Sequence, residues 1–187
     1  PVGLTTRVPH GAEVLILTFG DEEGRRIYRH TAAHVLAHAA MQLFPGTKLG
    51  IGPALEDRFY YDMEFPKPVT TGDLQALHER MCEIIDSDLP ITREEISRDD
   101  AIAMFEGLGQ SYKVELVRDL PPDEVVTLYR QGDWVDLCRG PHLPSTGHLD
   151  KSGIALLSLA GAYWRGDETN PMLQRVYGTA FADAAAL

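Results

Sequence analysis

The sequence contains little cysteine: only Cys82 and Cys138 occur among its 187 residues. Two cysteines in different local contexts do not make the disulfide framework that stabilises small secreted domains. We therefore expect a reducing compartment and a cytoplasmic protein. The sequence also has no apolar run near the ~20 residues that a membrane-spanning helix needs, so we expect no membrane partner.

Basic residues are scarce as well. The chain has 17 Lys and Arg against 28 Asp and Glu, which gives a net charge of −11. That sign disfavours nonspecific binding of nucleic acid by the whole surface. An RNA partner would need a local basic patch or an attached domain. The hydrophobic content of 44% and the charged content of 24% are ordinary for a globular protein.

Hydrophobic periodicity predicts a long helix over residues 25–44, ended by the Pro-Gly pair at 45–46. Apolar side chains cover most of its circumference, and only Arg26, Arg29 and Gln42 mark an outer edge. A helix that is apolar nearly all round is buried. We therefore expect this helix at the centre of the fold.

Most of the remaining sequence favours strands. Runs rich in β-branched and aromatic residues predict strands at 13–19, 48–51, 54–65, 91–96, 125–130, 133–138, 154–163 and 173–181. Helices are expected over 71–86 and 97–105, the second starting at Ser97 with Asp100 three residues on, while 111–118 fits a short helix or a turn. This order favours an α+β fold with an antiparallel sheet, helices packed on one face, and the central buried histidine-bearing helix lining a pocket.

The predicted central helix carries a stripe of histidines. His30, His34 and His38 are spaced four apart and share one face. Histidines in a buried helix are as often hydrogen-bonded core residues as ligands. The stripe alone therefore does not establish a site.

A second cluster strengthens the case. Asp136, Cys138 and His142 lie together around the end of a predicted strand. With His30 and His34 they make an HxxxH plus CxxxH set, which supplies four nitrogen and sulfur ligands suitable for tetrahedral zinc. Without metal, the same groups could orient a water molecule and act as general base beside a scissile ester. Because the Cys-rich knuckles typical of structural zinc sites are missing, a catalytic or substrate-binding pocket is the better interpretation.

Longer motifs point to a family. They are the histidine motif and its flanks at 29–38, Ile-Gly-Pro at 51–53, Phe-Tyr-Tyr-Asp at 59–62, Ser-Tyr-Lys-Val at 111–114, and the segments 135–142, 160–167 and 172–181. In this order they resemble the editing domain (N2) of bacterial threonyl-tRNA synthetases. The HxxxH and CxxxH pair alone is shared with alanyl-tRNA editing domains, but the longer motifs favour the threonyl form.

The resemblance implies a division of the chain. Residues 25–181 would be the editing domain. Residues 1–24 would be a leader and the last strand of a preceding ubiquitin-like domain, and 182–187 the start of a linker helix towards a catalytic core that is absent from the sequence.

The resemblance also implies a site. The catalytic set would be His30, His34, Lys113, Cys138 and His142, and the substrate-binding set would be Asp136, Tyr61 and His38. Editing would require no cofactor, although zinc could be held by His30, His34, Cys138 and His142; ATP and a catalytic zinc would belong to the absent core. By residue type alone, Lys113 would be a solvated lysine, and Asp136 either a surface carboxylate or an anchor for a substrate ammonium group.

The implied function is post-transfer editing, in which water hydrolyses the ester of mischarged Ser-tRNA(Thr). The partner would be the 3′ acceptor end of tRNA(Thr) carrying serine, and the parent synthetase would be a homodimer through the absent core. This chain would not activate threonine. Two alternatives remain open: a zinc-dependent hydrolase of the alanyl editing kind, and a non-catalytic module that binds the acceptor end of tRNA.

Overall fold

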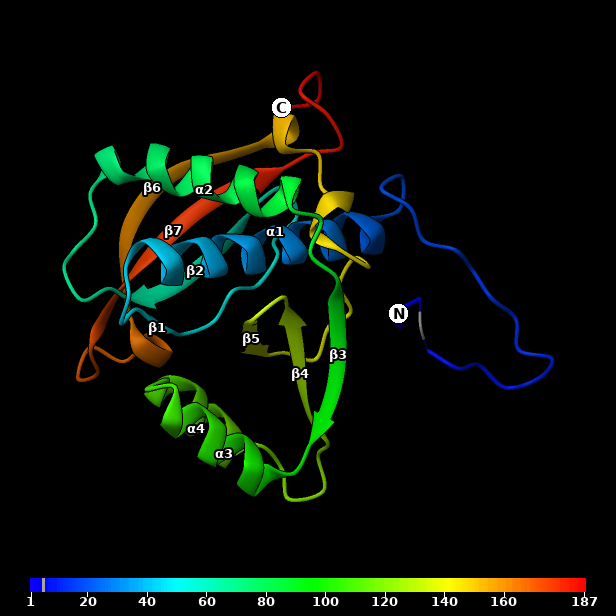
Figure 1. Cartoon of the computed structure of the whole chain (residues 1–187), viewed down its shortest axis with the longest axis horizontal. Helices are drawn as coiled ribbons and strands as arrows, with labels where there is room; N and C mark the ends of the chain where they lie inside the picture. Colours follow the sequence, from blue (N-terminus) through cyan, green and yellow to red (C-terminus); the bar gives the residue numbers. More distant parts are fainter. Residues whose placement is uncertain (5) are drawn as a thin grey trace.

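A 22-residue helix, α1 (Glu22–Leu43), runs through the centre of the molecule (Figure 1). Every residue from Thr31 to Ala40 is buried. Many of these residues are alanines, whose small side chains let neighbouring elements approach the helix closely. The helix ends at Leu43, directly before the Phe44-Pro45-Gly46 turn. The predicted buried helix is thus confirmed, and it supplies the framework on which the other elements pack.

The computed structural model describes residues 1–4 and 6–187. In chain order after α1 the elements are β1 (Lys48–Leu49), β2 (Phe59–Glu64), α2 (Leu74–Asp86), β3 (Ile91–Ile96), α3 (Arg98–Gly107), α4 (Ser111–Asp119), β4 (Val126–Gln131), β5 (Trp134–Leu137), β6 (Ile154–Tyr163) and β7 (Met172–Ala180). Short 3₁₀ turns lie at Thr71–Asp73, Thr146–His148, Lys151–Gly153 and Trp164–Gly166. None of the helices among the described residues is long and apolar enough to cross a membrane.

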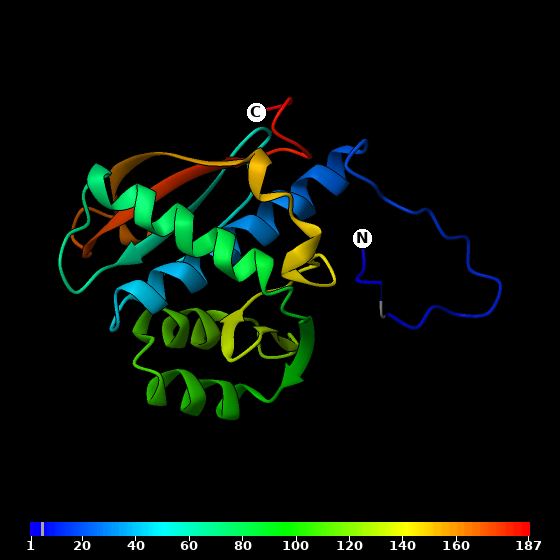
Figure 2. The same ribbon diagram turned by 45° about the horizontal axis from the view of Figure 1, so that its top comes forward.

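The strands form two antiparallel sheets. One has the order β1-β2-β7-β6 and the other β3-β4-β5. Helices α1 and α2 pack together on one face of the four-stranded sheet (Figure 2). Helix α2 buries Leu77, Met81, Ile84 and Ile85, which recur at the helical spacing of three and four. The α+β class with antiparallel strands is confirmed, although the strands divide between two sheets where the sequence suggested one.

The three-stranded sheet has its own helical layer. Helices α3 and α4 lie on the side of α1 opposite α2 (Figure 2). Their apolar residues meet strand β4 in a second core formed by Ala101, Phe105, Val114, Val117, Val126 and Leu128. Helix α3 begins as expected: the Ser97 hydroxyl oxygen accepts a hydrogen bond from the Asp100 amide. Residues 111–118, whose sequence fitted either a short helix or a turn, lie in helix α4. The α1 helix therefore lies between the two layers.

Three expectations are wrong. Residues 13–19 form no strand in the described structure; Val14, Leu15 and Ile16 are exposed in a segment that extends away from the body (Figure 1), where no neighbouring strand pairs with them. The terminal residues 182–187 form bends and a turn and no helix. Arg29, expected at an outer edge, is buried: its guanidinium donates to the carbonyl of Glu56 and lies against the rings of Phe19 and Phe181. The assignment of both termini to neighbouring domains stays a prediction.

Candidate active site

Helix α1 and the end of strand β5 bring the two sequence clusters together. His30 and His34 face Cys138 and His142, and one ligand atom from each of the four side chains lies within 4.8 Å of the other three. Cys138 Sγ lies 3.6 Å from His30 Nε2 and 3.3 Å from His142 Nε2. Two segments about a hundred residues apart in the sequence therefore form one compact group of donors.

Neighbouring polar groups fix this cluster. The Thr31 hydroxyl lies 3.3 Å from His142 Nδ1 and accepts a hydrogen bond from the Leu143 amide at 3.1 Å. The Gly140 amide donates to Cys138 Sγ at 3.2 Å. Gly140 has a φ of +68°, and a Cβ there would lie 2.0 Å from the Tyr129 hydroxyl. Only glycine fits this turn, so the turn holds its amide against the sulfur.

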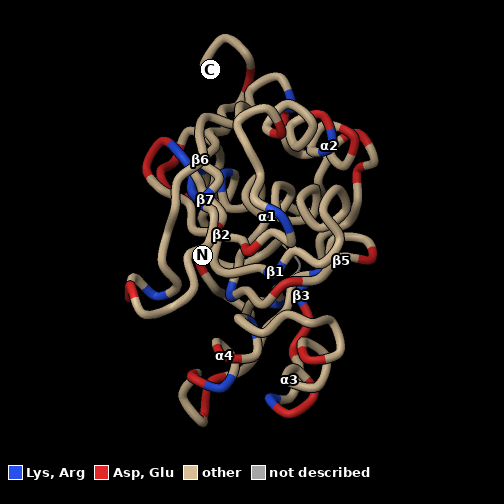
Figure 3. The backbone as a smooth tube through the Cα atoms, turned by 90° about the vertical axis from the view of Figure 1, so that its left-hand side faces the viewer, with Lys and Arg blue, Asp and Glu red and all other residues tan. Residues whose placement is uncertain are grey.

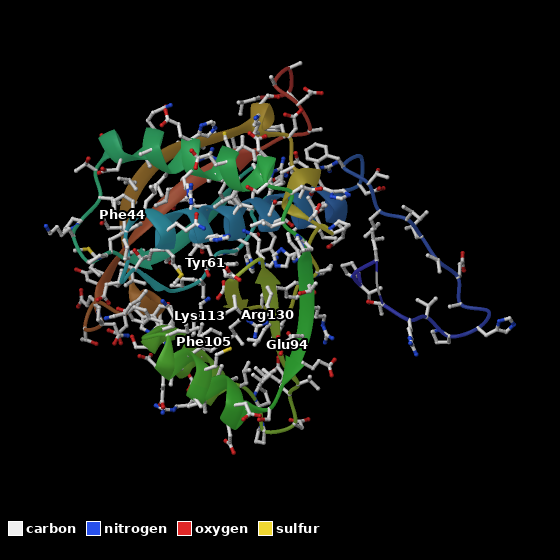
Figure 4. The ribbon with its side chains drawn as sticks, in the orientation of Figure 1. Phe44, Tyr61, Glu94, Phe105, Lys113 and Arg130 are labelled. Atoms are coloured by element: carbon white, nitrogen blue, oxygen red, sulfur yellow. The ribbon has the colours of Figure 1, made fainter. Side chains whose placement is uncertain are left out.

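A buried network of charges adjoins the cluster. Lys113 on α4 and Asp136 on β5 are 2% and 1% exposed, and Lys113 Nζ lies 2.7 Å from Asp136 Oδ1. Lys113 also donates to the Tyr61 hydroxyl at 3.0 Å, and that hydroxyl donates to Asp136 Oδ2. Figure 4 shows Tyr61 and Lys113 lying close together between α1 and α4. His34 Nε2 lies 3.7 Å from the same carboxylate oxygen, so the network continues into the histidine cluster.

These groups meet in a cavity of about 500 Å³. His30, His34, Tyr61, Lys113, Asp136 and Cys138 line it, together with the loop at 51–54 and Arg26 and Arg139. The backbone of Gly52 lies against the Tyr61 ring, and a Cβ there would be 2.2 Å from a ring carbon. The absence of a side chain at Gly52 therefore lets this loop close over Tyr61 and form one wall.

Burial sets the protonation states. It lowers the pKa of His30 to about 4, with Arg26 and Lys113 adding to the effect. Burial also lowers the pKa values of His34 and His142 well below the usual range, and the neighbouring imidazoles act in the same direction. Burial raises the pKa of the Cys138 thiol to about 12. At pH 7 the cluster thus presents neutral imidazoles and a neutral thiol. Such imidazoles can accept protons, whereas the thiol is a poor nucleophile.

Comparison with known proteins identifies the segment that carries β4 to β7. Residues 126–177 match the threonyl and alanyl tRNA synthetase second additional domain. This segment is thus similar to that domain. Asp136, Cys138 and His142 lie within the matched segment, whereas His30 and His34 lie on α1, outside it.

Similar full-length proteins extend the relationship over the whole chain. The threonine–tRNA ligase of Maricaulis maris is 56% identical over 172 residues, which are 92% of this chain and 27% of the ligase. That of Rhodospirillum rubrum is 53% identical over 98% of this chain and 28% of the ligase. That of Nitratidesulfovibrio vulgaris is 51% identical over 100% of this chain and 29% of the ligase. The resemblance to threonyl-tRNA synthetases is thus confirmed. The chain spans less than a third of the length of these curated relatives.

The structure brings seven of the eight predicted site residues together. His30, His34, Tyr61, Lys113, Asp136 and Cys138 line the cavity, and His142 lies behind them in contact with Cys138 and His34. Lys113, which residue type alone would leave solvated, is buried and paired with Asp136, which is also buried. The adjacent tyrosines of β2 point to opposite sides of the strand: Tyr61 reaches the cavity, while Tyr60 packs beside Arg175.

His38 is the residue that the structure does not bring to the cavity. It lies beyond Trp134, with its ring nitrogens 2.8 Å from Gln42 Nε2 and 2.9 Å from Gln131 Nε2. It lines a separate cavity with Arg80 and other residues. A role for His38 in substrate binding gains no support from this position.

Sequence reasoning missed several residues that shape the site. Thr31 contacts His142, Trp134 forms a T-shaped contact with His34, and Arg26 and Arg139 line the cavity. Thr31 and Arg139 directly follow His30 and Cys138, so their position next to predicted ligands was the available signal. For Trp134 the signal was the two-residue spacing from Asp136, which puts both on one face of β5.

The four-residue donor set fits zinc. Tetrahedral zinc with imidazole and thiolate ligands has donor atoms about 3.3–3.6 Å apart. The measured separations of 3.3 and 3.6 Å, with all four atoms inside 4.8 Å, are compatible with such an ion. His30, His34, Cys138 and His142 are the residues that would hold it. Binding would require Cys138 to lose its proton.

Proposed function

We propose that this chain hydrolyses the ester bond of mischarged Ser-tRNA(Thr), as an editing domain of a threonyl-tRNA synthetase. The observation that carries the proposal is the juxtaposition of His30 and Cys138, 3.6 Å apart, with the buried pair Lys113 and Asp136 in one cavity. The similarity to threonine–tRNA ligases supports the choice of RNA-linked ester as substrate.

The cavity offers separate places for the two ends of the seryl group. The Asp136 carboxylate accepts hydrogen bonds from Lys113, Tyr61 and the Leu137 amide. An ionised carboxylate has about four acceptor positions, so one remains for the ammonium group of the substrate. Lys113 can then donate towards the ester carbonyl and stabilise the charge that develops on its oxygen.

Water is the nucleophile in this scheme. His30 lines the cavity, and because its pKa is lowered to about 4 it is a free base at pH 7. The low pKa makes His30 a weaker base, but all of the enzyme is in the competent form. His34 and His142 pack against one another behind it, with ring centroids 4.0 Å apart. The neutral thiol of Cys138 is unsuited to form an acyl-enzyme and instead bounds the water site.

The selection problem explains why such a site would exist. Serine and threonine differ by one methyl group, which is worth only ~1–3 kcal/mol of discrimination in a binding pocket. A second site that hydrolyses the smaller product corrects the errors that remain. In the proposed scheme the polar network around Asp136 reads the serine hydroxyl, and the extra methyl of threonine would clash with the cavity wall or displace the attacking water.

A zinc-dependent hydrolase is the second candidate, because the four donors fit the ion. A bound zinc ion would act as a Lewis acid and lower the pKa of a coordinated water. Four protein ligands, however, complete a tetrahedral shell, whereas catalytic zinc sites keep a position open for water. The metal-free scheme, in which His30 keeps a free lone pair, therefore describes the arrangement better.

Deacylation of Ser-tRNA(Thr) and Thr-tRNA(Thr) by the 187-residue chain tests the proposal. We expect selective loss of serine, and loss of that activity in His30→Ala and in Lys113→Ala. Binding of uncharged tRNA without any deacylation would show a non-catalytic acceptor-end module instead. Full activity in both variants would contradict the assigned roles.

A further inference from the structure

Two arginines stand at the solvent side of the cavity. Arg26 and Arg139 both line it, and their side chains are 54% and 77% exposed. Arg26 lies one helical turn before His30 on α1, and Arg139 directly follows Cys138. The two arginines come from different elements. Each is near in sequence to one of two cavity residues, His30 and Cys138, whose Nε2 and Sγ atoms are 3.6 Å apart.

The charge of the rest of the chain makes these arginines notable. The net charge is −11, and acidic residues are spread over α2, α3 and several loops (Figure 3). The third cation of the described cavity lining, Lys113, is buried and bound to Asp136. Arg26 and Arg139 are therefore the cations of this lining that an anion in solvent can reach.

Both arginines can exchange their present partners. Arg26 Nη2 lies 2.9 Å from Glu23, and Arg139 Nε donates to Glu124 at 2.7 Å. Both guanidinium groups are solvent-exposed, and ion pairs at the protein surface contribute little to stability. A guanidinium group binds phosphate with two parallel hydrogen bonds, so a phosphate can replace a surface carboxylate at little cost.

We propose that Arg26 and Arg139 together bind the 5′-phosphate of the terminal nucleotide while its 3′-ester occupies the cavity. This proposal rests on the proposed function, because it assumes an aminoacylated RNA end as substrate. Phosphate and ester are attached to the same ribose, so a contact to the phosphate fixes the ester above His30 and Cys138. The contact carries no base information and acts as a positional anchor.

Two small substrates isolate this contact. One is the 3′-seryl ester of adenosine, which has no phosphate, and the other is the 3′-seryl ester of AMP, which has the 5′-phosphate. We expect the wild-type chain to show a kcat/KM at least about tenfold higher for the AMP ester, mainly through KM. Arg26→Gln and Arg139→Gln should each reduce this ratio severalfold, and the double variant should bring it close to one. Added salt should reduce the wild-type ratio.

Arg93→Gln is the matched control. Arg93 is an exposed arginine paired with Glu95 on β3, and it does not line the cavity. We expect this variant to keep the wild-type ratio. A wild-type ratio near one, or a ratio that both cavity variants leave unchanged, would overturn the proposal.

Binding of AMP and adenosine, measured by calorimetry, separates the two proposals. Tighter binding of AMP by the wild type, lost in the double variant, supports the arginine site even if neither ester is hydrolysed, an outcome that would refute the editing function alone. Equal binding of AMP and adenosine would refute the arginine site even if both esters are hydrolysed.

Discussion

The ring of His38 stacks on the ring of Trp134, with an interplanar angle of 10° and centroids 5.6 Å apart. Trp134 also contacts His34, which lines the cavity: the two rings form a T-shaped contact with centroids 5.3 Å apart. Gln42 accepts a hydrogen bond from Arg80 through its oxygen, so its amide nitrogen donates to His38 Nε2. His38 therefore supports the wall behind His34.

Trp134 should accordingly position His34. We expect Trp134→Leu to lower kcat for deacylation about 10–100-fold with little change in KM, because a displaced imidazole misaligns the reacting groups. Trp134→Phe retains a flat ring and should stay within a few fold of wild type. Steady-state kinetics on folded protein, verified by circular dichroism, measures the difference. Equal losses in both variants would indicate a purely structural role.

The buried pair of Lys113 and Asp136 gives a stability prediction. Lys113→Met leaves the Asp136 carboxylate buried without its cation, and we expect a loss of about 3–5 kcal/mol in the free energy of unfolding. Asp136→Asn should also be strongly destabilising. The double variant removes both charges and should be more stable than the sum of the two losses implies. Urea unfolding of the four proteins completes the cycle, and additive losses would argue against a coupled pair.

The features that the sequence predicts well are local. The α1 helix, its burial, the Ser97 cap and the β6 range all follow from spacing and residue type within a short window. The failures depend on partners elsewhere in the chain. The run at 13–19 has strand-forming residues, but a strand needs a neighbour to pair with, and the described structure provides none there.

For the site as well, the sequence predicts local spacing but not which residues reach the cavity. The four-residue spacing puts three histidines on one helix face, but His38 lies eight residues after His30, about 12 Å along the axis. The cavity is lined by His30 and His34 and does not extend along α1 as far as His38. Lys113 shows the opposite case: it is buried against Asp136 of β5 and Tyr61 of β2, and its local sequence gives no sign of this. Family resemblance, and not spacing, pointed to this lysine.

Acidification should destabilise the fold. Burial lowers the pKa of His38 to about 4 in the folded chain, against about 6.5 when unfolded. The unfolded state thus binds more protons between these values, so stability falls as the pH decreases from about 6.5 to 4. Each such histidine contributes a slope of up to about 1.4 kcal/mol per pH unit. Urea unfolding at pH 5, 6 and 7 measures how the free energy of unfolding depends on pH. This dependence should be weaker in His38→Gln than in the wild type, whereas His10→Gln, in the exposed N-terminal segment, should show the wild-type dependence.

Zinc provides a last test of the proposed chemistry. If His30 acts as a free base, chelators should leave deacylation unchanged, whereas added zinc should inhibit it, because the donor set that fits the ion includes the His30 lone pair. Inhibition should weaken in Cys138→Ala, measured as a higher zinc concentration for half-inhibition, with Cys82→Ala as the control. Cobalt binding followed by its thiolate absorption reports occupancy without reference to activity. Loss of deacylation on chelation, restored by stoichiometric zinc, would instead favour the zinc-dependent hydrolase.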